Sequence, residues 1–163
     1  MKKIINPWKG MEGYNCFGCA PHNESGVKME FFEDGDDIIS FWKPEPQFQG
    51  WIKTLHGGIQ AVLLDEICGW TVFRKMQTGG VTSKMEVRYL KPVNTDDSHL
   101  IIKARIKEIH RNLVTVEAEI RNSKDDVCST ALCTYFTFSK EKAEKDMHFR
   151  GCDVEPEEFI PLI

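Results

Sequence analysis

The chain has 163 residues, of which 41% are hydrophobic and 28% are charged, and its formal net charge at pH 7 is −4. This length is sufficient for one domain with a sizeable core, and a pI near 5.8 argues against a nucleic-acid-binding protein, which normally has a basic surface. We expect a single domain over residues 1–163, with an irregular segment over residues 1–25, a polar tail over residues 140–163 and no nucleic-acid partner.

The sequence has no uninterrupted apolar run near the roughly 18 residues that a membrane-spanning helix needs. Its N-terminus, MKKIINPWKG, also lacks the apolar run of a signal peptide. We therefore expect a cytoplasmic protein without a membrane partner. Its six cysteines are then expected to be thiols, because the cytosol keeps cysteines reduced.

The first predicted elements form a hairpin. Residues 27–32 (VKMEFF) and 37–42 (DIISFW) flank Asp34-Gly35, a dipeptide typical of tight turns between paired strands. Residues 43–54 hold two prolines and a glycine and are expected to form an ordered loop.

Residues 57–77 predict a long helix, because they contain no proline and consist mostly of good helix formers. Gly79-Gly80 follow as the expected C-terminal stop. Apolar residues cover most of the circumference, which is typical of a buried, central helix. Asp65 and Glu66 interrupt this apolar surface, and a charge is rarely buried without a partner or a function.

Four segments with apolar residues at every second position follow: residues 81–90, 99–109, 113–121 and 127–138. This alternation is typical of an antiparallel sheet with one solvated face, and a short helix is expected around residues 140–147. One helix about 30 Å long suits a curved sheet that must cover its apolar face. The predicted fold class is α+β, with an antiparallel sheet of about six strands wrapped around one long central helix.

Several motifs resemble the hotdog-fold acyl-CoA thioesterases, in the branch of the phenylacetic-acid pathway and four-hydroxybenzoyl-CoA enzymes. They are His56-Gly57-Gly58 with Asp65 nine positions after the histidine, FQGW at residues 48–51, VTSKMEVRYLKPV at residues 81–93 and NCFGC at residues 15–19. The resemblance covers roughly residues 14–138. It implies a hotdog fold, hydrolysis of an acyl-CoA thioester to a free acid and CoA, and a homodimer or homotetramer. It implies no cofactor apart from the CoA moiety of the substrate.

The resemblance also implies roles for particular residues. Asp65 would be the catalytic carboxylate, acting either as a nucleophile or as a general base. Gly57, and with it Gly58, would polarise the thioester carbonyl, because the first N–H groups of a helix have no intrahelical partner. His56 would orient the loop or contact the substrate, or serve only as a structural histidine. Glu66, rotated by about 100° from Asp65 on the helix, would be a structural partner.

Other positions follow the family pattern less closely. Gln49 is the amide nearest to the place where some relatives carry an asparagine before the HGG motif. Thr82 or Ser83 would hold the hydrolytic water, or be ordinary strand hydroxyls. The benzoyl-type enzymes have a threonine one turn after the carboxylate, where this chain has Gly69.

The spacing of Gly57 and Asp65 indicates a site shared between two subunits. The two residues are eight positions apart, about 12 Å along one helix, whereas both must come within about 3 to 3.5 Å of the same carbonyl group. We therefore expect a symmetric dimer in which Gly57 of one subunit lies near Asp65 of the other. Gly69 could allow the two helices to approach closely.

Basic residues gather between positions 84 and 111. Some of them are expected to contact the CoA phosphates, and Arg88 or Lys91 is the residue that we expect to do so. The alternative is that these residues are only the solvated faces of strands.

Cys16, Cys19 and His22 have a spacing that occurs in metal sites. A structural zinc site needs four ligands, and no second pair of suitable spacing follows. We therefore expect no metal, and a cysteine-rich turn that packs over the helix or the acyl pocket.

Two other functions stay open. A non-catalytic hotdog module would bind acyl-CoA or an acyl carrier without turnover, but it would not need Asp65 at the acyl carbonyl. A hotdog hydratase would need an Asp and His arrangement that is not evident here. The acyl chain, a preference for aromatic substrates and the choice between CoA and a carrier protein are not determined by the sequence.

Overall fold

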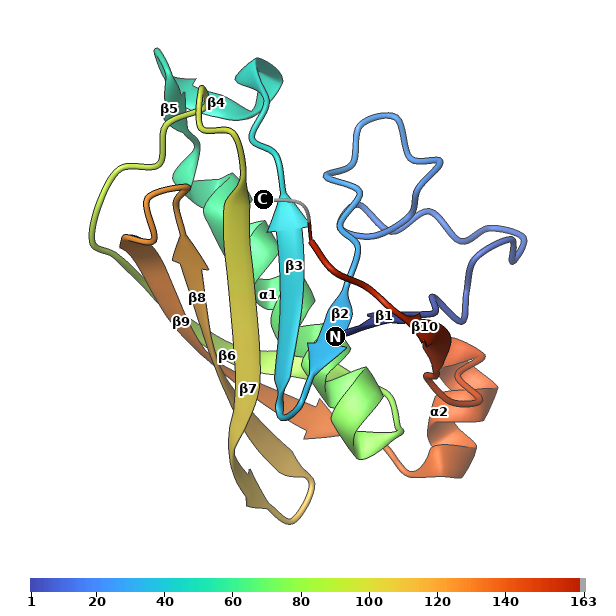
Figure 1. Ribbon diagram of the computed structural model, residues 1–163. Helices are drawn as coiled ribbons and strands as arrows, with labels where there is room; N and C mark the ends of the chain where they lie inside the picture. Colours follow the sequence, from blue (N-terminus) through green and yellow to red (C-terminus); the bar gives the residue numbers. More distant parts are fainter. Residues whose placement is uncertain (162–163) are drawn as a thin grey trace.

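The computed structural model describes residues 1–161 and contains a curved antiparallel sheet packed against one long helix (Figure 1). The helices are α1 (Gly57–Met76) and α2 (Lys140–Met147), and a 3₁₀ turn covers Pro46–Phe48. The strands are β1 (Lys2–Ile4), β2 (Phe32–Asp34), β3 (Asp37–Trp42), β4 (Gln49–Trp51), β5 (Thr54–Leu55), β6 (Gly80–Tyr89), β7 (Leu100–His110), β8 (Leu113–Arg121), β9 (Val127–Thr137) and β10 (Val154–Glu158). Within residues 1–161, neither helix has the length and apolar character needed to cross a membrane.

The main sheet has eight strands in the order β10-β1-β2-β3-β7-β8-β9-β6, with antiparallel neighbours throughout. The fold class predicted from the sequence is confirmed, with eight strands in place of about six. The two additional strands, β1 and β10, lie in the segments predicted to be irregular and polar. They are short, and β10 is almost entirely exposed, so neither shows the alternation that predicts a strand. Separate from this sheet, β4 and β5 form a two-stranded ribbon in the predicted loop.

Five predicted strands and both predicted helices match the structure within one residue at either end. The strand predicted over residues 27–32 is wrong, because β2 begins only at Phe32. Lys28 has φ of 52°, which interrupts an extended chain. The N–H groups of Val27 and Met29 donate to Phe17 O and Gly18 O in the cysteine-rich turn. This segment therefore pairs with the turn and not with a strand.

Helix α1 ends differently from the prediction. Its C-cap is Gln77, which has a left-handed backbone with φ of 51°, and its side chain bonds to the backbone of Arg74 and Cys152. These bonds offset the cost of a left-handed backbone at a residue other than glycine. Gly79 and Gly80 instead permit close packing, because a Cβ at Gly80 would lie 2.8 Å from Phe136 O.

The sheet covers one side of α1, and aromatic residues from both ends of the chain cover much of the rest. Figure 1 shows the N-terminal segment and α2 on the same side of the sheet as α1. Trp70 of α1 stacks on Phe31 with ring centroids 4.6 Å apart, and Phe73 meets Trp8 at 5.0 Å. Phe149, which follows α2, is also buried. The predicted polar tail thus contributes to the core.

Glu33 connects β2 to the end of α1. Its carboxylate lies 2.9 Å from Arg74 Nη2 and 2.6 Å from Lys75 Nζ, and its side chain is only 20% exposed. Burial by itself raises the pKa of Glu33, but the hydrogen bonds and charges of Lys75 and Arg74 outweigh it, so the pKa is lowered. The carboxylate therefore stabilises the fold when it is ionised.

We expect Glu33→Gln to lower the free energy of unfolding by about 1 to 3 kcal/mol at pH 7. Because the pKa of Glu33 is lower in the folded chain, the stability it contributes is present above the ordinary carboxyl pKa of about 4.3 and is lost as the pH falls below it. Denaturant unfolding at pH 7 and pH 3 measures the difference. Glu30→Gln is the control, because the Glu30 side chain is 62% exposed and its pair with Lys3 should contribute less than about 1 kcal/mol. An equal loss for Glu33→Gln at both pH values would contradict the prediction.

Candidate active site

His56 caps the N-terminus of α1. Its backbone is extended, and its Nδ1 atom accepts a hydrogen bond of 2.8 Å from the Gly58 N–H. Nδ1 must therefore be unprotonated in this arrangement. The Gly58 N–H is used by this cap, whereas the Gly57 N–H has no acceptor among residues 1–161. Of the two predicted polarising groups, Gly57 is the one whose N–H stays available.

The β4–β5 ribbon and β6 hold this helix end in place. A Cβ at Gly50 would lie 3.1 Å from the His56 Cα, so the ribbon packs directly on His56. The side-chain Oε1 of Gln49 accepts a hydrogen bond from Lys53 N, which holds it within the ribbon's own turn. On the other side, the Tyr89 hydroxyl donates to Gly57 O at 2.8 Å. The role of Tyr89 was not predicted. Nothing in the sequence indicates that an exposed tyrosine on a strand contacts the end of a helix.

Two hydroxyl groups hold one oxygen of the Asp65 carboxylate. Thr82 Oγ1 and the Tyr135 hydroxyl each lie 2.8 Å from Asp65 Oδ1, and the Tyr135 hydroxyl is also 2.8 Å from Asp65 O. The second oxygen, Oδ2, receives no hydrogen bond from any of the described residues. Burial and the negative charge of Asp65 raise the pKa of Tyr135, so its hydroxyl stays protonated as a donor.

The pairing of β6 with β9 explains why these two hydroxyls meet. Thr82 and Tyr135 are direct partners in this pairing, and the register shifts between Thr82 and Lys84. Because of this irregularity, the Ser83 hydroxyl does not contact Asp65 and instead donates to Thr134 O at 2.9 Å. Of the two predicted hydroxyls, Thr82 lies at the carboxylate and Ser83 does not. Tyr135 was missed because its place depends on strand register.

Asp65 lines a cavity of about 640 Å³ between the N-terminal segment, α1, the start of β6 and the end of α2. Its apolar wall includes Trp8, Met11, Phe73 and Met147. Gly69 also lines the cavity, and a Cβ there would lie 3.4 Å from the Tyr135 hydroxyl. The absence of a side chain at Gly69 thus leaves room for Tyr135 beside the carboxylate.

Glu66 points to a different group of partners. Trp70 Nε1 donates to Glu66 Oε1 at 3.1 Å, and Cys16 Sγ lies 3.5 Å from the same oxygen. A Cβ at Gly18 would lie 2.2 Å from Glu66 Oε2, so the cysteine-rich turn packs directly on this carboxylate. The hydrogen bond with Cys19 lowers the pKa of the Cys16 thiol, although burial opposes it. His22 is not part of this group, because its Nε2 lies 2.6 Å from Tyr14 O.

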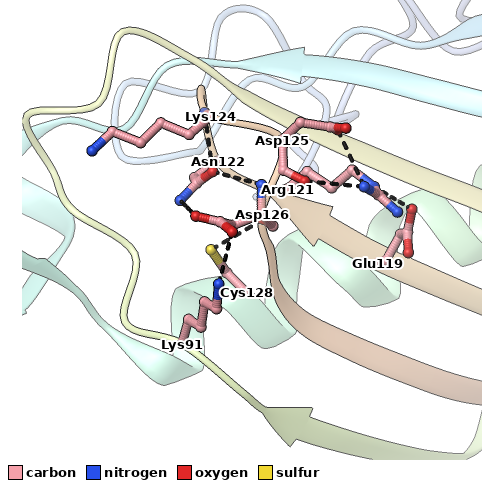
Figure 2. Close-up of polar contacts among 8 residues, drawn as sticks. All are labelled: Lys91, Glu119, Arg121, Asn122, Lys124, Asp125, Asp126 and Cys128. Carbon is pink, nitrogen blue, oxygen red and sulfur yellow. Dashed lines mark hydrogen bonds and ion pairs between the residues drawn. The ribbon is translucent and has the colours of Figure 1, made fainter.

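The two residues predicted to bind CoA do not line the cavity that contains Asp65, as far as the described residues show. Lys91 Nζ is 2.7 Å from Asp126 Oδ1, and Figure 2 shows this ion pair within the polar network of the β8–β9 turn. Asn122 Oδ1 organises that turn by accepting from the N–H groups of Lys124 and Asp126. Arg88 is more exposed, and its contact with Glu86 is 3.5 Å long.

Comparison with known proteins gives one family match. Residues 52–129 match the family model of the thioesterase superfamily. No curated protein matches the chain.

Solved structures share the fold. A thioesterase superfamily protein is 20% identical with a TM-score of 0.69, and the match covers 74% of this chain and 62% of that one. A hypothetical thioesterase from Streptococcus pneumoniae, solved with coenzyme A, is 25% identical with a TM-score of 0.64, covering 69% of this chain and 87% of that one. The smu.793 protein of Streptococcus mutans, bound to acetyl-CoA, is 19% identical with a TM-score of 0.66, covering 81% and 98%. The chain thus spans about three fifths of the length of the first of these proteins.

The matched segment contains Gly57, Asp65 and Thr82, whereas Tyr135 lies beyond it. The predicted branch within the family stays a prediction. The family match and the architecture agree with each other: residues 52–129 match the thioesterase superfamily model, and the chain has the hotdog fold of the solved thioesterase structures.

Proposed function

We propose that the protein hydrolyses an acyl-CoA thioester to a free acid and CoA, with Asp65 as the catalytic carboxylate. The observation that carries this proposal is the hydrogen bonding of the Asp65 carboxylate. Its Oδ1 accepts from two hydroxyls, whereas its Oδ2 has no donor among the described residues. The carboxylate lies at the wall of a partly apolar cavity. The solved relatives that hold coenzyme A and acetyl-CoA support the substrate class. A cavity of about 640 Å³ falls within the usual range for small-molecule sites.

Asp65 can act in either of two ways. As a general base, its free oxygen takes a proton from a water molecule while the water oxygen attacks the carbonyl carbon, and the C–S bond then breaks to release CoA as a thiolate. As a nucleophile, the carboxylate itself forms a mixed anhydride with release of the CoA thiolate, and water then cleaves the anhydride. Thr82 and Tyr135 serve as positioning residues in both cases, because they fix the orientation of the carboxylate.

Gly57 supplies the polarising group in this proposal. Its N–H lies at the positive end of the α1 dipole and can donate to the carbonyl oxygen, on which negative charge develops during attack. His56 acts indirectly, by capping the helix and shaping the loop. Because Gly57 and Asp65 are about 12 Å apart along the helix axis, a single chain does not bring both to one carbonyl group.

The edge strand β6 supports a shared site. It ends the sheet order, and Val81, Tyr89 and Leu90 on or beside it are each at least 50% exposed. Thr82, near one end of β6, contacts Asp65, and Tyr89, at the other end, contacts Gly57. Antiparallel pairing of two β6 strands about their centre would therefore bring the Gly57 end of one subunit to the Asp65 end of its partner.

A non-catalytic acyl-binding module is the alternative function. It uses the same cavity but makes no use of a carboxylate whose second oxygen is free. Release of free thiol from acyl-CoA by the parent protein distinguishes the enzyme from the binding module.

We expect Asp65→Asn to lower kcat by about 10² to 10⁴, because the amide keeps the size of the side chain but cannot act as a base. Glu66→Gln should keep turnover within about tenfold. Release of free thiol from a panel of aliphatic and aromatic acyl-CoA substrates measures both, and thermal unfolding checks that the variants fold. If Asp65→Asn were as active as the parent while Glu66→Gln was inactive, the catalytic carboxylate would be Glu66. If the parent cleaved no thioester but was stabilised by acyl-CoA, the binding module would replace the enzyme.

Gly57→Pro should lower kcat by about 10² to 10³, because it removes the N–H that we assign to the carbonyl oxygen. Proline is favoured at the first position of a helix, and His56 has the extended backbone that a residue before proline prefers. Gly57→Ala, which keeps the N–H, is the control and should stay within about tenfold of the parent.

Mixing the Gly57→Pro and Asp65→Asn chains tests the shared site. A mixed dimer contains one site with an intact Gly57 and an intact Asp65 only if the two residues come from different subunits. Activity should therefore return on refolding the mixture, to roughly a quarter of the parent value. Light scattering should show at least a dimer, and a monomer or a lack of rescue would contradict the shared site.

We expect Arg88→Gln to raise the KM for an acyl-CoA substrate by about three- to tenfold. Salt should raise the parent's KM, because at 0.1 M it screens the attraction between exposed charges that are more than about 10 Å apart. Lys91→Gln should have a smaller effect, since Asp126 already compensates its charge. An N-acetylcysteamine thioester of the same acyl group lacks the CoA phosphates and serves as the control substrate. If its KM rose equally in Arg88→Gln, the arginine would not be acting on the phosphates.

A further inference from the structure

Three potential metal ligands meet where the N-terminal segment packs on α1. The Sγ atoms of Cys16 and Cys19 and a carboxylate oxygen of Glu66 all lie within 4.8 Å of one another. Cys16 Sγ is 3.5 Å from Glu66 Oε1 and 3.7 Å from Oε2. A tetrahedral Zn²⁺ ion, with bonds of about 2.3 Å to sulfur and about 2.1 Å to oxygen, keeps such ligand atoms about 3.6 Å apart. The cluster therefore has nearly the dimensions of a zinc site.

The local fold forces this approach. Val27 and Met29 hold the cysteine-rich turn through hydrogen bonds to Phe17 O and Gly18 O. Within the turn, Gly18 faces the Glu66 carboxylate so closely that a Cβ would lie 2.2 Å from Oε2. A side chain of any size at position 18 would push the carboxylate away from the two thiols.

The third ligand differs from the one that the sequence spacing indicates. Cys-x₂-Cys-x₂-His would combine the cysteines with His22, but His22 Nε2 lies 2.6 Å from Tyr14 O. Glu66, from the middle of α1, takes that place although it is 50 positions away from Cys16 in the chain.

The charges around Glu66 also favour a cation. Among the described residues its side chain is hydrogen-bonded by Trp70 Nε1 and by the cysteine thiols, and no lysine or arginine pairs with it. A half-buried carboxylate beside two thiols lacks a compensating positive charge, and a divalent ion would supply one.

We propose that Cys16, Cys19 and Glu66 bind a Zn²⁺ ion whose fourth coordination position faces the cavity that also contains Asp65. All three ligands line that cavity, so a water molecule can occupy the open position. On binding, each thiol loses its proton, and two protons are released to solvent. Thiolate ligands select zinc over magnesium or calcium, which prefer oxygen.

The zinc ion would tie the N-terminal segment to α1. This segment contains little regular structure before β2, so few backbone hydrogen bonds hold it on the helix. Metal binding adds its free energy to folding because the ligands come together only in the folded chain. The proposal is independent of thioester hydrolysis, since neither Asp65 nor Gly57 is a ligand.

Cobalt titration of the metal-free, fully reduced protein tests the site. We expect a thiolate-to-cobalt charge-transfer absorption that saturates at one Co²⁺ per chain and disappears when Zn²⁺ is added. Cys16→Ser and Cys19→Ser should lose this absorption, and Glu66→Gln should weaken Co²⁺ binding at least tenfold. His22→Gln is the matched control and should bind within about twofold of the parent, with the same rise in thermal midpoint on addition of Zn²⁺.

A measurement on the unchanged protein guards against variants that fail to fold. Zn²⁺ should slow alkylation of Cys16 at least tenfold, as followed by mass spectrometry of the labelled peptides. The proposal is overturned if the parent shows no thiolate absorption with Co²⁺ and no zinc protection of Cys16. It is also overturned if His22→Gln loses binding while Glu66→Gln keeps it, because the ligand set would then be the one given by sequence spacing.

Discussion

Two neighbouring carboxylates in the middle of an otherwise apolar helix impose the main constraint on this fold. A carboxylate withdrawn from water is costly unless polar groups contact it, and Asp65 and Glu66 project about 100° apart on α1. They therefore need separate partners. Asp65 receives the hydroxyls of Thr82 and Tyr135 from the sheet, whereas Glu66 receives Trp70 and the cysteine-rich turn.

The two sets of partners come from distant parts of the chain, and the cavity lies between them. The paired β6 and β9 strands form the wall at Asp65, and the N-terminal segment forms the wall at Glu66. Trp8 joins that segment to the end of α2 through a hydrogen bond of 2.7 Å to Met147 O. A segment with little regular structure thus helps to shape the cavity in which we propose that the acyl group lies.

Strand β6 connects the two chemical groups of the proposed site. Thr82 near its start reaches Asp65, and Tyr89 at its end reaches the carbonyl of Gly57, so one strand positions both the carboxylate and the helix N-terminus. The same strand is an open edge of the sheet. The geometry of the site and the proposed pairing with a second copy therefore involve the same ten residues.

The sequence by itself determined the elements with a strong local period and the residues within one motif. The helix over residues 57–76, five of the strands and the hairpin turn follow from hydrophobic period and turn residues, which act over a few positions. The motif His56-Gly57-Gly58 with Asp65 lies within one helix and its cap, so its spacing is visible in the chain. Only the tertiary structure decided what depends on register or on contacts across the chain. Tyr135 reaches Asp65 because β9 pairs with β6 in one register, and Glu66 replaces His22 beside the cysteines because the turn packs on α1. The tertiary structure also decided the terminal strands β1 and β10 and the start of β2. The pairing of a short segment depends on the strand that lies beside it and not on its own residues.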